Sequence, residues 1–244
     1  MLLKLLKFHD CKELMPDYSL SRRVTAEFIG SAFLLAVIVG SGIMGERLAG
    51  GNVAIALLAN TLATGAGLLA LILTFGPISG AHFNPAVTLI CVLRRDLNGY
   101  DAIPYLLAQF SGAIAGVFMA HLMFGLAPFS LSHHERSGLS QAFSEFVATF
   151  GLLTVIVCGV RHRPAAAPFT VAAYVTAGYW FTASTALANP AVTVARSLTD
   201  TFSGIRPVDA PAFIVSQLLA TLTVYFLLSW LLATPPKAAG ALTS

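Results

Sequence analysis

The chain has 244 residues and a net charge of +3, with 57% hydrophobic and only 10% charged residues, and its mean hydropathy is +0.79. A soluble domain usually carries about 25% charged residues, so this composition argues against a soluble enzyme or a nucleic-acid-binding domain. The three cysteines, Cys11, Cys91 and Cys158, are odd in number and far apart. They predict neither a disulfide framework nor a zinc site.

The charged residues are bunched, which leaves long uncharged stretches along the chain. These stretches cover residues 48–93, 102–134, 146–160, 164–195 and 210–236. A helix needs roughly 20 apolar residues to cross a bilayer, so the stretches predict membrane spans. We place six spans, at 24–45, 53–75, 103–125, 139–160, 167–183 and 210–233.

The chain before the first span mixes leucines with lysines over residues 1–14. Its apolar run is too short and too interrupted for a cleaved signal peptide. Two interpretations stay open, an amphipathic helix on the cytoplasmic membrane surface or a frayed tail. We therefore expect one membrane domain over 24–233, between an N-terminal segment 1–23 and a cytoplasmic tail 234–244.

Two apolar pieces are left between the spans, at 76–93 and 184–198. The first begins with the turn residues Gly76-Pro77, and the second contains Asn189-Pro190. Nine helical residues rise only about 13 Å, whereas the hydrocarbon core is about 30 Å thick. Both pieces are therefore predicted to be re-entrant half-helices. Irregular backbone at that depth must be buried in protein or line a wet cavity, so the pattern indicates a pore or binding site at the midplane.

The two halves of the chain repeat each other. The matches are Ala26–Ile29 with Ser144–Val147, Asn84–Thr88 with Asn189–Thr193, and Ala108-Gln109 with Ser216-Gln217. Each half, about 24–125 and about 139–233, holds three spans, so the second half must lie upside down relative to the first. Inverted repeats with broken helices are typical of membrane transport proteins. The fold class predicted is an all-α membrane protein of six spans plus two half-helices in two inverted repeats.

Lysine and arginine are distributed unevenly between the two ends of the predicted bundle. Ten lie on the side of the N-terminus, and four, Arg47, Arg136, Arg196 and Arg206, lie on the other. Positive charge favours the cytoplasmic side, which predicts a multi-pass protein of the inner or plasma membrane with both termini in the cytoplasm. The half-helices then enter from opposite faces and meet at the centre.

The repeated motif consists of Asn84, Pro85 and Ala86 in the first half and Asn189, Pro190 and Ala191 in the second. Asn followed by Pro is typical of a helix start, because the Asn oxygen caps free N–H groups and Pro has no N–H to leave unpaired. The Asn amide N–H₂ is then expected to point freely into the lumen. Both helix N-termini face the centre, each with about half a positive charge, which would repel cations and protons while neutral hydroxylated molecules pass.

Two carboxylates occupy equivalent positions in the repeats, Glu27 in the first span and Glu145 in the fourth. Ionisable groups inside a membrane are usually paired or functional. We expect each to brace a re-entrant loop by accepting hydrogen bonds from its backbone N–H groups. The alternatives are an interfacial glutamate at a helix N-terminus and a proton relay.

The residues Ser79–Thr88 together with Asn189-Pro190-Ala191 resemble the two signature loops of the aquaporin, or major intrinsic protein, family. The resemblance covers roughly residues 24–233. It implies a pore within each protomer, a homotetramer in the lipid bilayer, and small neutral solutes and water as the molecules that pass.

One departure from the family pattern concerns the outer constriction, the selectivity filter. Typical members have Arg directly after the second Asn-Pro-Ala, whereas this chain has Val192. Family spacing assigns the other filter positions to Thr64, to Ala186 and, on the fifth span, to either Ala177 or Tyr179. Loss of the guanidinium removes five donors and a fixed charge. A bacterial branch with Val at this position, associated with arsenic resistance, is similar to this chain.

Arg196 lies four residues beyond Val192, on the same face of the half-helix. It is a candidate for an outer-pore charge, and the alternative is an arginine that reaches out to the membrane interface. The adjacent His133, His134 and Glu135 lie in an outer loop, where we expect a solvated loop rather than a metal site.

The leading hypothesis is a passive channel for uncharged solutes of glycerol or urea size, with arsenite-type metalloid hydroxides and water as further solutes. The alternative is a mainly water-selective aquaporin. An ion-coupled transporter would need a carboxylate in the lumen, and the two glutamates are better used as braces. The pattern predicts no catalytic residue, metal site or cofactor.

Overall fold

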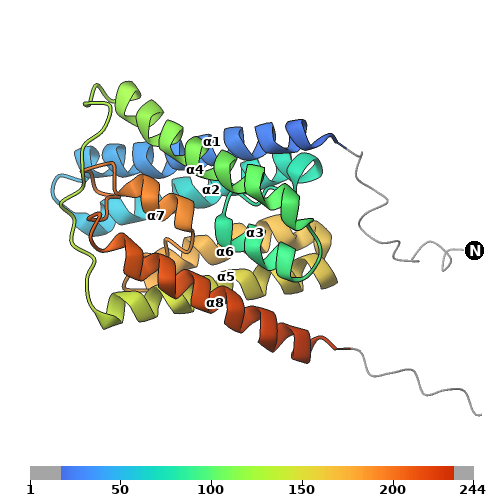
Figure 1. Ribbon diagram of the computed structural model, residues 1–244. Helices are drawn as coiled ribbons and strands as arrows, with labels where there is room; N and C mark the ends of the chain where they lie inside the picture. The colour runs from blue at the N-terminus through green and yellow to red at the C-terminus, as the bar shows by residue number, and fades with distance from the viewer. Residues whose placement is uncertain (1–17, 234–244) are drawn as a thin grey trace, which may run out of the picture.

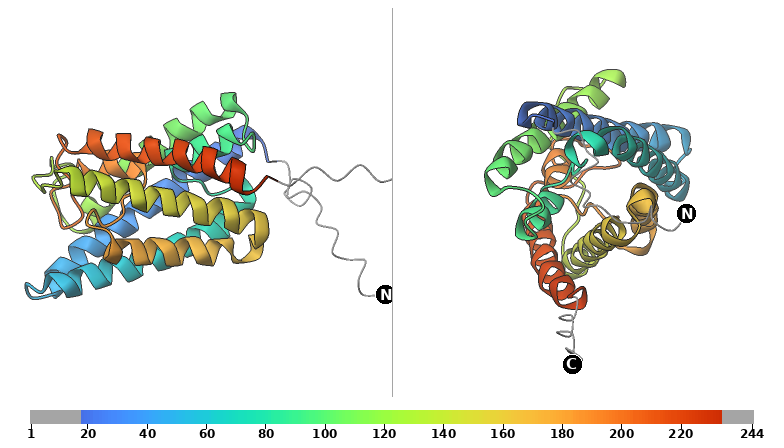
Figure 2. Two further views of the ribbon diagram at one scale, coloured as in Figure 1. Left: turned by 90° about the horizontal axis from the view of Figure 1, so that it is seen from below. Right: turned by 90° about the vertical axis from the view of Figure 1, so that its right-hand side faces the viewer.

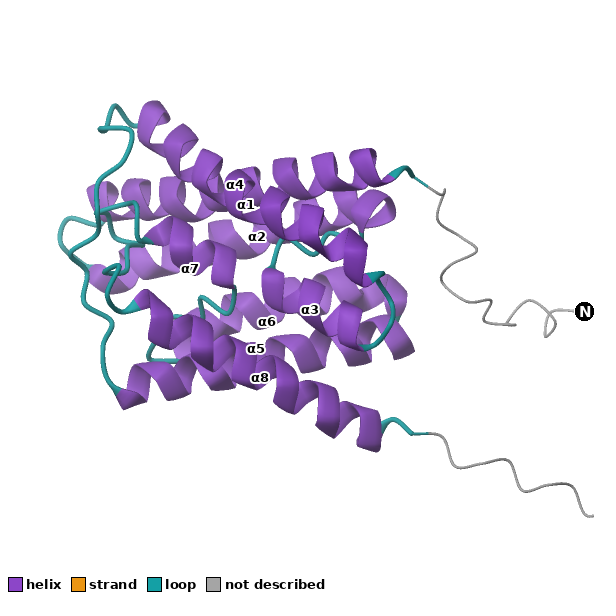
Figure 3. Ribbon diagram, in the orientation of Figure 1, coloured by secondary structure: helices purple, strands orange, loops and turns teal. Residues whose placement is uncertain are grey.

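The computed structural model describes residues 18–233, which fold into a bundle of helices (Figures 1 and 3). The long helices are α1 (Leu20–Leu48), α2 (Val53–Ser79), α4 (Gly99–Met123), α5 (Leu139–His162) and α8 (Ala210–Leu231). The shorter ones are α3 (Pro85–Leu93), the 3₁₀ turn η2 (Pro164–Ala166), α6 (Ala167–Phe181) and α7 (Pro190–Arg196). The N-terminal residues for which an interfacial helix was considered, 1–14, lie outside the described part.

Five helices in the described part are long and apolar enough to cross a membrane, namely α1, α2, α4, α5 and α8. The sixth predicted span corresponds to α6, which has only 15 residues and rises about 22 Å. The 3₁₀ turn η2 directly precedes it and lengthens the segment. The predicted six-span arrangement is therefore present, with one span shorter than the others.

The inverted repeats are visible in how the helices pair. In the first half α1 packs against α4 and α2, and in the second half α5 packs against α8 and α6. The two short helices α3 and α7 pack between α4 and α8, at one side of the ring of helices seen from one end (Figure 2). The start of α1 and the end of α8 lie at the same end of the bundle (Figure 1), as three spans in each half require.

The predicted start of the first re-entrant piece at Gly76-Pro77 is wrong, because α2 continues through both residues to Ser79. Proline removes one N–H donor, and in the last helical turn this costs a single hydrogen bond. The helix ends one turn later at Gly80, which has a φ of 86°, and its N–H donates to the Gly76 carbonyl at 2.9 Å. A left-handed residue at a helix end favours glycine, which has no Cβ to clash.

Candidate functional site

The two short helices begin with the repeated motif and point their N-termini at each other. Asn84 is the N-cap of α3, and its Oδ1 accepts from Ala86 N–H at 2.9 Å. Asn189 is the N-cap of α7, and its Oδ1 accepts from Ala191 N–H at 2.9 Å and from Val192 N–H at 3.2 Å. Each Asn oxygen thus satisfies helix N–H groups that have no partner within the helix.

The Asn amide nitrogens do not point freely into a lumen, which corrects the expectation from the sequence. Asn84 Nδ2 donates to the Ala188 carbonyl at 2.8 Å, and Asn189 Nδ2 donates to the Phe83 carbonyl at 2.8 Å. Each bond crosses from one repeat to the other. Since an amide group has two N–H donors, one remains on each Asn after the cross-bond, and both side chains are buried.

Glu27 lies beneath the loop that precedes α3 and accepts four hydrogen bonds. Its Oε1 accepts from the Ser79 hydroxyl at 2.7 Å and from His82 N–H at 2.9 Å. Its Oε2 accepts from Phe83 N–H at 2.7 Å and from Gln109 Nε2 at 2.8 Å. The carboxylate is fully buried, so these donors replace the hydrogen bonds that water would make to it.

Glu145 makes the equivalent contacts in the second half. Its Oε1 accepts from Leu187 N–H at 2.8 Å, and its Oε2 accepts from Ala188 N–H at 2.9 Å and from Gln217 Nε2 at 2.7 Å. These are the loop hydrogen bonds expected of a brace. An exposed interfacial position is wrong for both glutamates, since both are fully buried.

Gln109 and Gln217 are the residues whose role the sequence reasoning missed. Gln109 Nε2 also donates to the Thr88 hydroxyl at 2.8 Å, and Gln217 Nε2 donates to the Thr193 hydroxyl at 3.0 Å. Each glutamine therefore ties the glutamate beneath a loop to the half-helix that follows that loop. Both glutamines stand in the repeat match, which was the available signal.

Three left-handed residues shape the loop before the second motif. Thr185, Ala186 and Ala188 have φ values of 59°, 50° and 46°. This backbone conformation is uncommon for residues other than glycine and is held only where surrounding contacts over-determine it. The two hydrogen bonds that Glu145 accepts from the N–H groups of residues 187 and 188 are such contacts.

The filter positions assigned by family spacing form two groups in the structure, Thr64 with Tyr179 and Ala186 with Val192. Tyr179 is the fifth-span residue that lies against Thr64, with 3.3 Å between the two hydroxyl oxygens. Both side chains are buried, whereas Ala177 is exposed on the outside of α6. Ala186 and Val192 are buried in one apolar cluster, so the wall from the second loop is apolar.

Arg196 is buried on α7 rather than exposed at a membrane interface, since only 2% of its surface is accessible. Its Nε donates to the Ser203 carbonyl. The alternative of an arginine that reaches out to the interface is therefore wrong. The segment after α7 folds back over this helix, and sequence spacing alone gave no signal of that.

The outer-loop residues His133, His134 and Glu135 do not gather around a common point. His133 Nδ1 lies 3.0 Å from Asp200 Oδ2, while Glu135 pairs with Arg206 at 3.2 Å. Hydrogen bonds from the His133 backbone N–H and ring lower the pKa of Asp200. Within residues 18–233 no group of three or more potential metal ligands is found.

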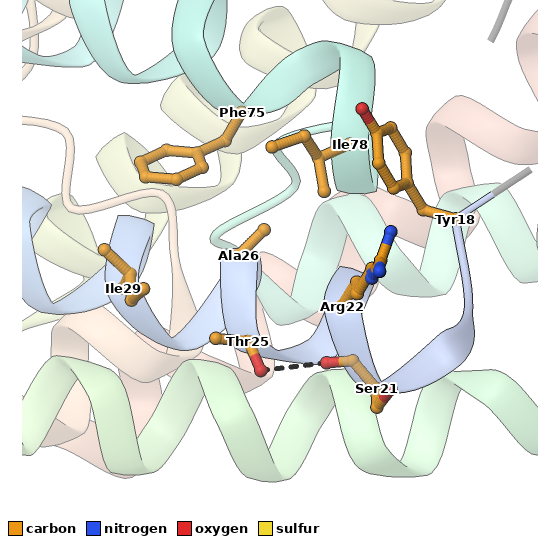
Figure 4. A pocket seen from close by; sticks show the side chains of 8 residues that line it. All are labelled: Tyr18, Ser21, Arg22, Thr25, Ala26, Ile29, Phe75 and Ile78. Carbon is orange, nitrogen blue, oxygen red and sulfur yellow. Dashed lines mark hydrogen bonds between the residues drawn. The ribbon is translucent and has the colours of Figure 1, made fainter. Parts of the chain in front are cut away.

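A surface groove lies where the first turns of α1 face the end of α2 (Figure 4). Tyr18 and Arg22 line it from one side and Phe75 and Ile78 from the other. The Phe75 ring packs edge-on against Phe83 of the first loop at 6.2 Å. Because its lining is mainly apolar, the groove offers a solute few hydrogen bonds, and the two motifs remain the better candidate site.

Comparison with known proteins agrees with this geometry. The family model described as Major intrinsic protein matches residues 15–174. Aquaglyceroporin AqpS of Rhizobium meliloti is 50% identical over 218 residues, covering 89% of this chain and 93% of that protein. Aquaporin AqpM of Methanothermobacter thermautotrophicus is 30% identical over 246 residues, covering 86% and 99%.

A solved structure shares the fold. The X-ray structure of the aquaglyceroporin from Plasmodium falciparum matches with a TM-score of 0.66 and 19% identity, covering 88% of this chain and 98% of that chain. At that identity the match bears on the fold alone. With the family model and the relatives above, it leads to one conclusion: this chain belongs to the major intrinsic protein family and is a multi-pass membrane channel for small solutes rather than an enzyme.

Proposed function

We propose that the protein is a passive channel for uncharged solutes of glycerol or urea size, and that it excludes ions and protons. Water and undissociated metalloid hydroxides such as arsenous acid are uncharged and no larger than glycerol, and they are further solutes of the proposed channel. The relative with half of its residues identical is named an aquaglyceroporin, which supports the glycerol part of the proposal.

The observation that carries the proposal is the apolar side chain directly after the second motif. Val192 is 3% exposed and packs in one cluster with Ala186. A valine here offers no hydrogen-bond donor and no charge, and it takes up less room than an arginine. A wider and less polar constriction lets molecules larger than water pass, such as glycerol, urea and arsenous acid.

One barrier to ions is formed by the two helix N-termini at the centre. The α3 and α7 N-caps are joined by the cross-repeat hydrogen bonds of Asn84 and Asn189, so the positive ends of both dipoles face the same region. A cation there meets positive potential on both sides. A hydroxyl oxygen, by contrast, is attracted by the remaining Asn N–H donors.

A mainly water-selective channel is the second candidate, and two observations favour it. The Thr64 and Tyr179 hydroxyl oxygens are 3.3 Å apart, and so close a pair would narrow the proposed filter. Arg196 is buried one helical turn further along α7, where its charge would favour water over less polar solutes.

The experiment that separates the two candidates is stopped-flow light scattering on proteoliposomes. We expect the wild type to pass glycerol, urea and arsenous acid as well as water, and Val192→Arg to suppress the larger solutes while water flux continues. If the wild type passes water alone, the channel is water-selective, and Tyr179 and Arg196 become the residues to change.

We also propose a location in the inner or plasma membrane, cytoplasmic termini, and a homotetramer. Ser137 and Asp96 are exposed and lie in the connections α4–α5 and α3–α4, which are at opposite ends of the bundle (Figure 1). Cysteines introduced at these two positions test the orientation. A membrane-impermeant thiol reagent should label Ser137→Cys in intact cells and Asp96→Cys only after lysis. The reverse pattern would invert the topology, and native mass spectrometry tests the tetramer.

A further inference from the structure

The loop between α4 and α5 is attached along its length to the segment that follows α7. Ser132 N–H donates to the Ser197 carbonyl at 3.1 Å, and Arg206 N–H donates to the His134 carbonyl at 2.8 Å. The Arg136 N–H donates to Asp209 Oδ2 at 2.8 Å. These bonds fix the backbone of residue 136 at the outer end of the second half-helix.

From this position the Arg136 side chain reaches the loop that precedes the second motif. Its Nε donates to the Gly204 carbonyl at 2.8 Å, and its Nη1 donates to the Ser184 carbonyl at 3.1 Å and the Thr185 hydroxyl at 3.3 Å. Thr185 is adjacent to the filter position Ala186. The guanidinium is thus held by both segments that form the outer wall of the site.

The charge of Arg136 is not neutralised by a carboxylate in contact with it. Its guanidinium partners are two carbonyls and a hydroxyl. Asp209 accepts only from the backbone N–H and is paired with Arg206 at 3.0 Å, and Glu145 is occupied by the second loop and Gln217.

Arg196 adds a second positive charge on the same side of Val192. Burial lowers the pKa of Arg136 to about 9, and the nearby Arg196 charge acts in the same direction. Arg136 therefore remains protonated at neutral pH. Its Nη2 has no hydrogen-bond partner among the residues that the structure describes, which leaves donors for a solute.

We propose that Arg136 is a specificity-determining residue of the outer pore. Val192 on α7 offers the pore neither a charge nor a hydrogen-bond donor. Arg136, in the loop between α4 and α5, supplies both. Its ligands are the hydroxyl oxygens of small neutral polyols, and its charge keeps cations from the outer mouth. This role rests on the proposed channel function: Arg136 sets the upper size of the solutes that the channel passes.

The first test compares solute size selection in proteoliposomes. For Arg136→Ala we expect the xylitol-to-glycerol permeability ratio to rise at least about fivefold, because a contact that distinguishes the two solutes is lost. We also expect a sodium conductance to appear. Arg136→Lys keeps the charge but not the fork of donors, so it should exclude sodium while its size limit relaxes. Arg47→Ala, which removes an exposed arginine elsewhere on the outer side, is the matched control and should leave both readings unchanged.

A second measurement separates charge from structural support. Arg136→Cys is treated with aminoethyl methanethiosulfonate, which adds a cation, or with methyl methanethiosulfonate, which adds a neutral group. Sodium exclusion should return with the first reagent and not with the second. The wild type treated in the same way controls for the native cysteines Cys11, Cys91 and Cys158.

Two results would overturn the inference. One is an Arg136→Ala protein with wild-type thermal stability, an unchanged polyol ratio and no sodium conductance. The other is equal restoration by the charged and the neutral reagent, which would make Arg136 a structural support only. If the wild type itself passes no glycerol, the channel proposal fails first, so the two failures are distinguishable.

Discussion

Tyr179 and Ala177 are the two candidates for the fifth-span position of the proposed filter. Tyr179 lies against Thr64, while Ala177 is exposed on the same helix, α6. We expect Tyr179→Ala to widen the constriction and to raise polyol flux severalfold in proteoliposomes. Ala177→Val changes an exposed side chain on the same helix and should leave flux unchanged. Equal effects from both variants would contradict the assignment of Tyr179 to the filter.

The buried glutamates are a second feature at the residue scale. In Glu145→Ala the N–H groups of Leu187 and Ala188 and the Gln217 amide lose their acceptor. Each buried donor left unpaired costs about 1–3 kcal/mol, so we expect a loss of at least about 3 kcal/mol in the free energy of unfolding. Unfolding in mixed micelles followed by circular dichroism measures it.

Glu46→Ala is the matched control for that experiment, because Glu46 is an exposed glutamate on α1. It should change stability by less than about 0.5 kcal/mol. A Glu145→Ala protein as stable as the wild type would show that the loop before α7 holds its left-handed residues without the carboxylate.

At the scale of whole helices, the close approach of α1 and α4 depends on two glycines. A Cβ on Gly112 would lie 2.4 Å from the Phe28 carbonyl oxygen, and one on Gly116 would lie 2.2 Å from that of Ala32. Backbone atoms cannot move aside as the end of a flexible side chain can, so any larger residue must push the helices apart. The small residues thus set the interaxial distance.

We expect Gly116→Ala to lower the free energy of unfolding by about 1–3 kcal/mol, the usual cost of overpacking. Gly99→Ala in the same helix adds a Cβ that meets nothing nearer than 4.0 Å. It should be neutral or stabilise by up to about 1 kcal/mol, because alanine has less conformational freedom to lose. Thermal denaturation in detergent compares the two, and equal melting temperatures would contradict the helix-contact argument.

At the scale of the whole molecule, the two repeats are joined at the centre by a reciprocal pair of hydrogen bonds. Asn84 donates to the second loop and Asn189 donates to the first. Since each bond holds the two loops at the spacing that the other requires, we expect the single changes Asn84→Ala and Asn189→Ala to be non-additive. The coupling free energy should be about 0.5–3 kcal/mol, as for residues within one network.

A double-mutant cycle on the free energy of unfolding measures this coupling. The control cycle pairs Asn84→Ala with Asn98→Ala, which removes the exposed N-cap of α4. Residues that share no partners should add within about 0.5 kcal/mol. Additivity in the Asn84 and Asn189 cycle as well would mean that the repeats are held together by helix packing alone.

The spans, the inverted repeats, the two half-helices and the motif N-caps could be predicted from the sequence. All of them are local or repeated patterns, because hydropathy acts over about 20 residues and an Asn-Pro cap over about four. The brace role of Glu27 and Glu145 followed from the same repeat. The start of the first half-helix was mispredicted, since Gly76-Pro77 also fits the last turn of α2.

The filter and the central contacts were decided by tertiary structure. Ala177 and Tyr179 are two residues apart, which on a helix is a rotation of about 200°, so only the packing of α6 against α2 selects the one that meets Thr64. The cross-bonds of the two asparagines join residues 104 and 106 positions apart. The approach of Arg136 to Ser184 spans 48 positions and depends on how one loop lies on another. Sequence determined which groups are available to this channel, and the packing of distant segments determined which of them meet.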